Sequence, residues 1–272
     1  MTAATALAPA PATAQAQAPS TDWQRRVARA FSRAAPRYDR LAVAQHAMGE
    51  TLWARLPAHA DATLDLGCGP GHWSARLADR FGEGGAVTGL DLAPGMLEEA
   101  RRRHGERIRW LCADAAALPL PDGRLDLVFS NLALQWCPDL ESVLAELHRV
   151  LRPGGRALIN TLAPGTLAEV AAAWSRPGRP AALLGFRDAA RHAEEAHHAG
   201  FSRVEVEAHT QRFHYPDLAA VMASIKGVGA QAARGKGLTR ADLARATRRY
   251  EALREPEGLP VTYRLLTLEL ER

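Results

Sequence analysis

Cysteine is scarce in the sequence, with three residues in 272, and none of them stands at a spacing that suits zinc or a redox pair. Cys68, Cys112 and Cys137 therefore indicate a reducing compartment, and we expect the protein in the cytoplasm. Long apolar runs are also missing, since no run reaches the roughly 18 residues of a membrane-spanning helix. We expect neither a bound metal nor a membrane segment.

Basic residues are absent from the first 20 positions, which are mostly Ala, Pro, Thr and Gln. This composition matches neither a secretory signal nor a typical transit peptide, and it predicts a disordered tail over residues 1–21. Residues 22–272 are expected to form a single domain, because 47% hydrophobic content supports a sizeable core. The net charge of +4 allows an acidic partner, but no nucleic-acid module is recognisable, so we do not expect nucleic acid.

The most informative stretch is Leu64–Trp73, where apolar residues lead into an aspartate and glycines follow at alternate positions. The pattern predicts a buried strand, a tight turn and then a helix. Glycine tolerates positive φ and lets a ligand approach the backbone, and the N–H groups at a helix start favour polar or anionic groups. The cofactor-binding residues expected here are Asp65, Gly67, Cys68, Gly69 and Gly71. The alternative is a glycine-rich turn without a ligand.

The order Asp-x-Gly-x-Gly-x-Gly differs from the G-x-G-x-x-G of dinucleotide sites. It resembles the first motif of the Rossmann-like S-adenosylmethionine-dependent methyltransferases, which implies S-adenosylmethionine as cofactor and S-adenosylhomocysteine as product. Asp91 ends a second strand, where a carboxylate can accept both ribose hydroxyls. Asp114 follows a third strand, and in the methyltransferase pattern an acidic residue there takes the adenine amino group.

Strand and helix patterns alternate along the chain, which predicts a Rossmann-like, doubly wound, mostly parallel seven-stranded α/β sheet with ligands at the carboxyl ends of the strands. The core is expected over 58–209 and 259–272, after N-terminal helices over 22–57 that break at Pro36. Residues 210–258 are expected to form a helical lid inserted before the last strand. The predicted strands are 62–66, 86–91, 107–112, 125–130, 155–161 and 204–208, with helices over 72–81, 94–104 and 139–151, a turn at Pro153–Gly155 and a linker over 163–180.

Several side chains beyond the acidic strand ends are candidates for the cofactor cleft. The flexible thioether of Met96 suits the adenine face, and the end of the fourth strand offers neutral donors and a flat wall. Ordinary core packing is the alternative for each. The remaining cofactor-binding candidates are Tyr38, Gln45, Leu92, Met96, Ala115, Asn131, Leu132 and Trp136.

Together, several stretches resemble one family, the malonyl-[acyl-carrier protein] O-methyltransferases of biotin synthesis. The resemblance covers about residues 24 to 270, and the Lys-Gly-x-Gly-Ala and Thr-Tyr elements make it specific. The matching stretches are Phe31–Ala35 with Tyr38, Asp65–Gly71, Ser130–Cys137, Thr161–Leu162 with Gly165–Leu167, Lys226–Ala230 and Pro260–Tyr263.

The resemblance implies methyl transfer to the free carboxylate of a malonyl thioester on acyl carrier protein. The methyl ester removes the negative charge of the malonyl carboxylate, so that fatty-acid enzymes can elongate the malonyl group as if it were an ordinary acyl group. We expect Lys226, or an arginine of the lid, to orient the carboxylate, with Tyr263 or Gln135 as neutral donors and Tyr38 holding the methionine part of the cofactor. Acyl carrier protein is acidic, so the basic lid and the N-terminal arginines are the expected docking face.

Three other functions stay open at the level of sequence. The first is a small-molecule methyltransferase that acts on a quinone precursor or a carboxylic acid. The second is an assembly factor, related to those of respiratory complex I, that keeps the cofactor fold without methyl transfer, and the third is a cofactor sensor. The sequence also leaves open the oligomeric state and the use of malonyl-coenzyme A.

Overall fold

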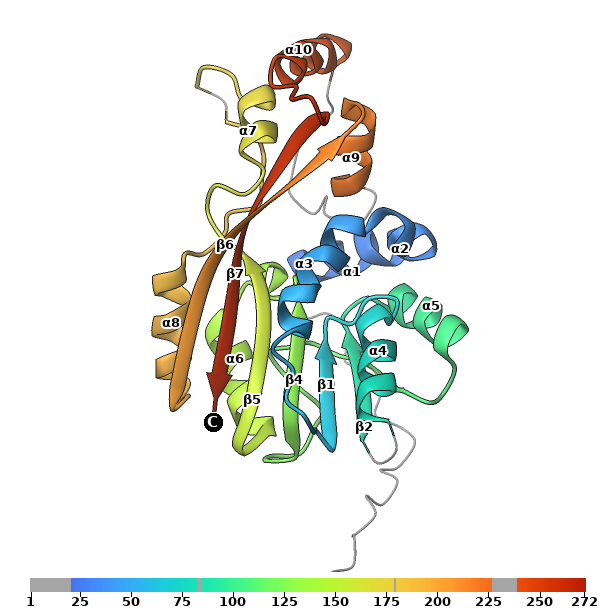
Figure 1. Ribbon diagram of the computed structural model, residues 1–272, viewed down its shortest axis with the longest axis vertical. Coiled ribbons are helices and arrows are strands. Elements are labelled where there is room, and N and C mark those ends of the chain that lie inside the picture. The colour runs from blue at the N-terminus through green and yellow to red at the C-terminus, as the bar shows by residue number, and fades with distance from the viewer. Residues whose placement is uncertain (1–20, 83–84, 179, 227–238) are drawn as a thin grey trace, which may run out of the picture.

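The computed structural model describes residues 21–82, 85–178, 180–226 and 239–272 (Figure 1). The tail predicted over 1–21 falls outside the described residues, except for Thr21, which caps the first helix. The Lys-Gly-x-Gly-Ala stretch also falls outside them after Lys226, and so does the side chain of Lys226 itself.

A seven-stranded sheet with the order β3-β2-β1-β4-β5-β7-β6 forms the centre of the molecule. All pairs among β1 to β5 are parallel, and β7 runs antiparallel to both of its neighbours. The prediction of a mostly parallel, doubly wound sheet is confirmed. The strands are β1 (Ala62–Leu66), β2 (Ala86–Asp91), β3 (Arg109–Cys112), β4 (Leu125–Asn131), β5 (Leu151–Leu162), β6 (Arg203–Tyr215) and β7 (Leu259–Glu271).

Helices cover both faces of this sheet, because the inner strands bury side chains on both sides. On β4, Val128 packs into one core with α6 (Leu140–Val150), whereas Leu127 and Phe129 pack into another with α4 (His72–Phe81). Figure 1 shows α3, α4 and α5 in front of the sheet and α6 behind it. The bounds of the other covering helices are α3 (Val43–Trp53), α5 (Pro94–His104) and α8 (Ala189–His198).

Several predicted boundaries are wrong. β3 begins at Arg109 rather than at 107, and Pro153–Gly155 lies inside β5, where the register with β4 shifts and Gly154 has a φ of +75°. β6 pairs with β7 as far as Tyr215, so residues 210–215 are strand and not lid. The strand is hard to see in sequence because its partner is distant and one face is exposed. The predicted linker contains a further helix, α7 (Ala168–Trp174).

The N-terminal helices lie across the carboxyl ends of the strands (Figure 1). Thr21 and Gln24 form a capping box at the start of α1 (Asp22–Ala34). The break predicted at Pro36 is confirmed as a 3₁₀ turn, since proline lacks the N–H that an α-helix needs. The short α2 (Tyr38–Leu41) then leads into α3.

The lid predicted over 210–258 contains α9 (Leu218–Lys226) and α10 (Arg240–Glu251), and these helices group with α7 around the protruding ends of β6 and β7 (Figure 1). A separate apolar core lies beneath it, and Met48 of α3 joins that core. The hydroxyl of Tyr250 donates to the carbonyl of Pro260 at 2.9 Å, which fixes α10 to β7. None of the helices in the described part of the chain has both the length and the apolarity needed to cross a bilayer.

Candidate active site

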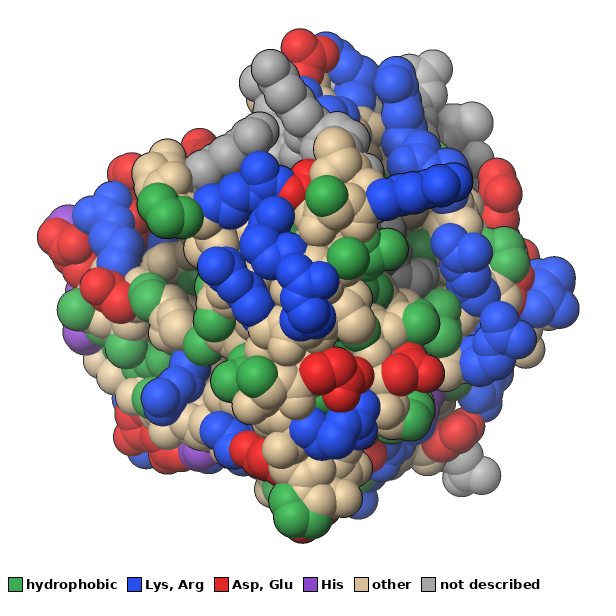
Figure 2. Space-filling model, turned by 90° about the horizontal axis from the view of Figure 1, so that it is seen from above, with side chains coloured by type: hydrophobic (Ala, Val, Ile, Leu, Met, Phe, Trp, Pro, Cys, Tyr) green, Lys and Arg blue, Asp and Glu red, His purple; other side chains and the backbone are tan. Residues whose placement is uncertain are grey.

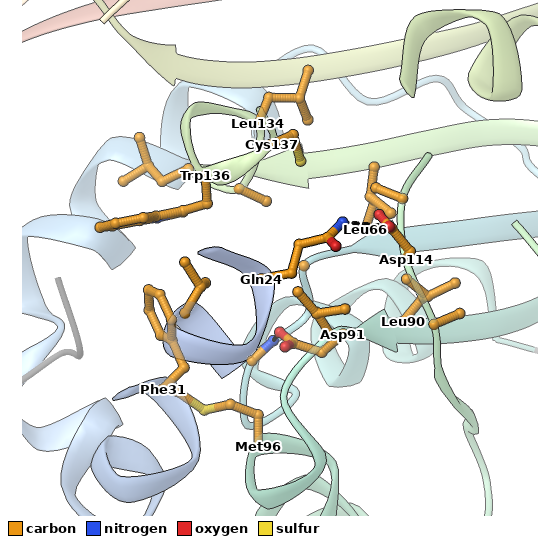
Figure 3. A pocket seen from close by; sticks show the side chains of 18 of the residues that line it. Gln24, Phe31, Leu66, Leu90, Asp91, Met96, Asp114, Leu134, Trp136 and Cys137 are labelled. Carbon is orange, nitrogen blue, oxygen red and sulfur yellow. Dashed lines mark hydrogen bonds between the residues drawn. The ribbon is translucent and has the colours of Figure 1, made fainter. Parts of the chain in front are cut away.

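A pocket of about 790 Å³, partly open to solvent, lies at the carboxyl ends of β1, β2 and β4 beneath α1 (Figure 3). Most of the predicted cofactor-binding residues line it. They are Tyr38, Gly67, Gly69, Asp91, Leu92, Met96, Asp114, Ala115, Asn131, Leu132 and Trp136.

The glycine turn places three residues in the left-handed region, with φ of +72° at Gly67, +54° at Gly69 and +87° at Gly71. A Cβ on Gly67 would come within 2.3 Å of the Ala133 Cβ, and one on Gly71 within 2.7 Å of the Trp110 ring. These two glycines are needed for packing. Gly69 differs, since a Cβ there would meet no heavy atom within 4 Å, so it leaves open space at the pocket wall.

Asp91 is held rigidly at the end of β2. Its Oδ2 accepts a hydrogen bond from the Gly69 N–H at 2.9 Å, and its Oδ1 accepts one from the Ala93 N–H at 2.8 Å. Burial raises the pKa of this carboxyl to about 6, against the lowering effect of the backbone donors. Each oxygen keeps a further lone pair, so the carboxylate can accept two ligand hydroxyls.

Asp65, Cys68 and Gly71 do not line the pocket. Asp65 is 1% exposed and lies under the turn, where its Oδ2 accepts a hydrogen bond from Ser74 Oγ at 2.5 Å. Burial raises the pKa of Asp65 to about 7, and the Ser74 hydrogen bond opposes that rise. The geometry therefore supports an indirect role, in which Asp65 joins the turn to the start of α4.

Gln24 is a site residue that sequence reasoning misses. Its Nε2 donates to Asp114 Oδ2 at 2.5 Å, while the Ala116 N–H donates to Asp114 Oδ1 at 3.0 Å (Figure 3). The spacing of Thr21 and Gln24 is a recognisable capping-box signal for a helix start. Nothing local indicates that this helix folds over Asp114.

Helix α1 closes the pocket through aromatic side chains as well. The Trp23 Nε1–H donates to the backbone carbonyl of Trp136 at 2.9 Å, and the Phe31 ring meets the Trp136 ring edge-on at a centroid distance of 5.3 Å. Phe31 and Trp136 both line the pocket, and Figure 3 shows them on the same side of it. The N-terminal helix is thus a wall of the site.

A second chamber of about 770 Å³, also partly open, adjoins the first. The two share Phe31, Tyr38, Leu132 and Trp136 as lining residues, so these side chains mark where they meet. Most of the remaining wall is apolar; four of its residues come from the segment before α8, and Ile225 comes from α9. The other lining residues are Gln45, Gln135, Leu162, Leu167, Ala182, Leu183, Leu184, Phe186, Ile225 and Tyr263.

No charged side chain is found among the described lining residues of this second chamber. Burial raises the pKa values of Tyr38 and Tyr263 above their usual range, and for Tyr38 the nearby Asp91 adds to the effect. Both hydroxyls are therefore protonated at neutral pH and can donate a hydrogen bond but not serve as a base. Gln135 is fixed at both ends, since its Nε2 donates to the Leu132 carbonyl at 2.7 Å and its Oε1 accepts from Thr161 Oγ1 at 3.3 Å.

Comparisons with known proteins agree with this geometry. A family model described as a methyltransferase domain matches residues 64–159. A malonyl-[acyl-carrier protein] O-methyltransferase of Pectobacterium atrosepticum is 39% identical over 256 residues, covering 88% of this chain and 93% of that one. The protein of the same name from Serratia marcescens is 42% identical over 207 residues, or 75% of this chain and 78% of its own.

A longer relative is the biotin biosynthesis bifunctional protein BioHC of Cellvibrio japonicus. It is 38% identical over 253 residues, and the match covers 91% of this chain and 50% of that protein. Among solved structures, phosphoethanolamine N-methyltransferase 2 of Haemonchus contortus, in complex with S-adenosyl-L-methionine, matches 82% of this chain and 52% of its own at 19% identity, with a TM-score of 0.54. The YcgJ protein of Bacillus subtilis matches 84% and 98% at 18% identity, with a TM-score of 0.57. These likenesses support the fold.

The strand order, the glycine turn and the acidic ends of β2 and β3 define a Rossmann-like methyltransferase of the S-adenosylmethionine-dependent class. Relatives at 36–42% identity match most of the chain, and they share one name. The chain belongs to the malonyl-[acyl-carrier protein] O-methyltransferase family. The resemblance drawn from the sequence is confirmed.

Proposed function

We propose that the protein transfers a methyl group from S-adenosylmethionine to the free carboxylate of malonyl-[acyl-carrier protein], giving the methyl ester that primes biotin synthesis. The observation that carries this proposal is the second chamber, which meets the cofactor pocket at Tyr38 and Trp136. A cofactor pocket is common to the whole class. An adjoining apolar chamber under the lid gives an acyl thioester a place beside it.

The residues of the first pocket fit the cofactor. The open space at Gly69 lets a ligand approach the backbone, and the Asp91 carboxylate is placed to accept ribose hydroxyls. Asp114 would take the adenine amino group, next to or in place of the Gln24 amide. Tyr38 lies where the two cavities meet, which supports its proposed role at the methionine part.

The chain's own residues position the nucleophile rather than activate it. A carboxylate with a pKa of roughly 3 to 4 is already ionised at pH 7 and needs no general base. The protonated state of Tyr38 and Tyr263 agrees with this requirement. When bound, the cofactor supplies a methyl group on a sulfonium; a carboxylate oxygen forms the new bond to carbon, and the sulfur keeps the electron pair of the broken bond. The apolar chamber orients the acyl end and limits water around it.

A basic face is the proposed docking surface for the acidic carrier protein. Figure 2 shows Lys and Arg side chains grouped on the face seen from above. In the described part of the chain, no ion pair involves Arg33, Arg37 or Arg40 of the N-terminal helices, or Arg248 of α10. These exposed guanidinium groups are available to a partner. Lys226 remains a proposed carboxylate contact.

The compartment and the absence of other partners are also proposals. All three cysteines, Cys68, Cys112 and Cys137, are free thiols, which is in keeping with a reducing cytoplasm. The acidic carrier protein is the partner that fits the basic face, and we propose neither nucleic acid nor a membrane as partner.

The test is direct. The protein is incubated with S-adenosylmethionine and malonyl-acyl carrier protein, and mass spectrometry looks for the gain of one CH₂ on the malonyl group. Succinyl- and acetyl-carrier proteins are the controls. Gain on malonyl alone is the expected result. No gain, with cofactor binding intact, would reject the proposal and favour a small-molecule methyltransferase or a non-methylating cofactor-binding protein.

A further inference from the structure

We propose that Gln45 binds the substrate carboxylate through its side-chain amide, and this inference rests on the function proposed above. The sequence predicts Gln45 at the cofactor cleft. The structure instead places it on the lining of the second chamber and not among the residues of the cofactor pocket. A residue on that wall faces the acyl substrate.

The backbone of Gln45 is fixed close to the junction of the two cavities. Its carbonyl accepts a hydrogen bond from Asn131 Nδ2 at 2.9 Å, and Asn131 lines the cofactor pocket. Asn131 is held in turn by Asn160, whose Nδ2 donates to Asn131 Oδ1 at 3.2 Å. The polar contacts from β5 through β4 to α3 therefore place Gln45 beside the cofactor pocket, with its side chain on the wall of the other chamber.

The side-chain amide of Gln45 is not satisfied by the protein. Its Oε1 is buried without a hydrogen-bond partner, and within the described residues no hydrogen bond uses its Nε2. An unpaired buried polar group costs about 1–3 kcal/mol, so most such groups in folded proteins have partners. Gln135, on the same chamber, shows the contrast because both ends of its amide are bonded. A carboxylate only accepts hydrogen bonds, so the group that can bind it is the Nε2 of Gln45, which has no partner among the described residues.

A neutral donor suits this nucleophile. A close Lys or Arg would stabilise the carboxylate charge and lower its basicity, which weakens its attack. The described lining of the chamber holds no charged side chain, and the polar groups that it does offer to a carboxylate are amides and hydroxyls. An amide can turn about its last torsion and present its N–H groups. Tyr263 adds a protonated hydroxyl to the same chamber.

The experiment measures binding without turnover. Malonyl-pantetheine and its methyl ester are titrated by calorimetry into the full-length protein saturated with S-adenosylhomocysteine. The variants are Gln45→Leu, which removes the donor, and Gln45→Glu, which adds a like charge. Val43→Gln is the matched control, since Val43 lies on the same helix and is 66% exposed.

Gln45→Leu should weaken binding of the acid about 10- to 100-fold, the size of a hydrogen bond to a charged group, and change binding of the ester little. Gln45→Glu should weaken acid binding further at pH 7. The affinity for S-adenosylhomocysteine should stay unchanged in both variants and in Val43→Gln. In turnover with the malonyl carrier, kcat/KM should fall by the same factor as the acid affinity.

Two results would overturn the inference. One is acid binding in Gln45→Leu equal to the wild type, and the other is an equal loss of S-adenosylhomocysteine affinity, which would return Gln45 to the cofactor site. Failure of the proposed function is a separate result, seen when the wild type adds no methyl to the malonyl carrier. In that case the comparison of acid with ester still decides whether Gln45 binds a carboxylate.

Discussion

Replacing Gly69 by alanine separates the stability of the glycine turn from its affinity for the cofactor. The residue has a φ of +54°, and an added Cβ would meet no heavy atom within 4 Å. The cofactor-free protein should therefore lose only the cost of a left-handed L-residue, about 1–2 kcal/mol. For a chain of this length, that corresponds to a fall in the melting temperature of about 2–8 °C.

The same Cβ should also weaken cofactor binding. Gly69 lines the cofactor pocket, and its N–H donates to Asp91, so a methyl group there occupies space beside the proposed ribose site. We expect the affinity for S-adenosylhomocysteine to fall by at least about 10-fold, which is about 1.4 kcal/mol. Calorimetric titration gives the affinity, and differential scanning calorimetry of the cofactor-free protein gives the stability.

Gly154→Ala is the matched control. Gly154 lies in β5 with a φ of +75°, its Cβ would also meet no heavy atom within 4 Å, and it does not line the pocket. This variant should lose the same stability and keep its cofactor affinity. Equal affinities in the two variants would refute the reasoning about Gly69. A much larger loss of stability in Gly69→Ala would show that the space is filled.

Three further predictions concern pH, the N-terminal helix and docking. Burial raises the pKa of Asp65 to about 7 and that of Asp91 to about 6. The folded protein therefore holds these two protons more tightly than the unfolded chain, in which the pKa of an aspartate is about 4. The resulting stabilisation is complete below about pH 4 and is lost as the pH rises through about 6 to 7. Urea unfolding of the cofactor-free protein should thus show lower stability at pH 8 than at pH 5, and a smaller difference in Asp65→Asn; an identical difference in that variant would contradict the assignment. Gln24→Leu removes both the donor to Asp114 and the capping-box partner of Thr21, so amide exchange in α1 should speed up at least about 10-fold, the effect of about 1.4 kcal/mol; unchanged exchange would show that neither contact holds the helix. Arg37→Glu should raise KM for the malonyl carrier several-fold at low salt and leave malonyl-pantetheine unaffected, because exposed charges act on the carrier only; an equal effect on both substrates would argue against a docking role.

Much of the fold could be predicted because its signals are local. Apolar runs that end at Leu66 and Asp91, each followed by helical periodicity, indicate strands of a parallel sheet and the edge where their carboxyl ends meet. The far end of β6 could not be predicted in the same way. Its register with β7 joins Arg203 to Glu271 and Tyr215 to Leu259, and partners this distant leave no local pattern.

The sequence by itself indicated the residues that are proposed for the cofactor half of the site. Glycines that need positive φ and acidic residues at strand ends carry their role in residue type and spacing, so Gly69, Asp91 and Asp114 were identifiable. Only the tertiary structure decided what covers and adjoins that half. Gln24 reaches Asp114 across 90 positions, and Gln45 lines the second chamber rather than the pocket proposed for the cofactor. The physical reason is that backbone conformation is encoded over a few neighbours, whereas the contacts of a side chain depend on how distant helices pack.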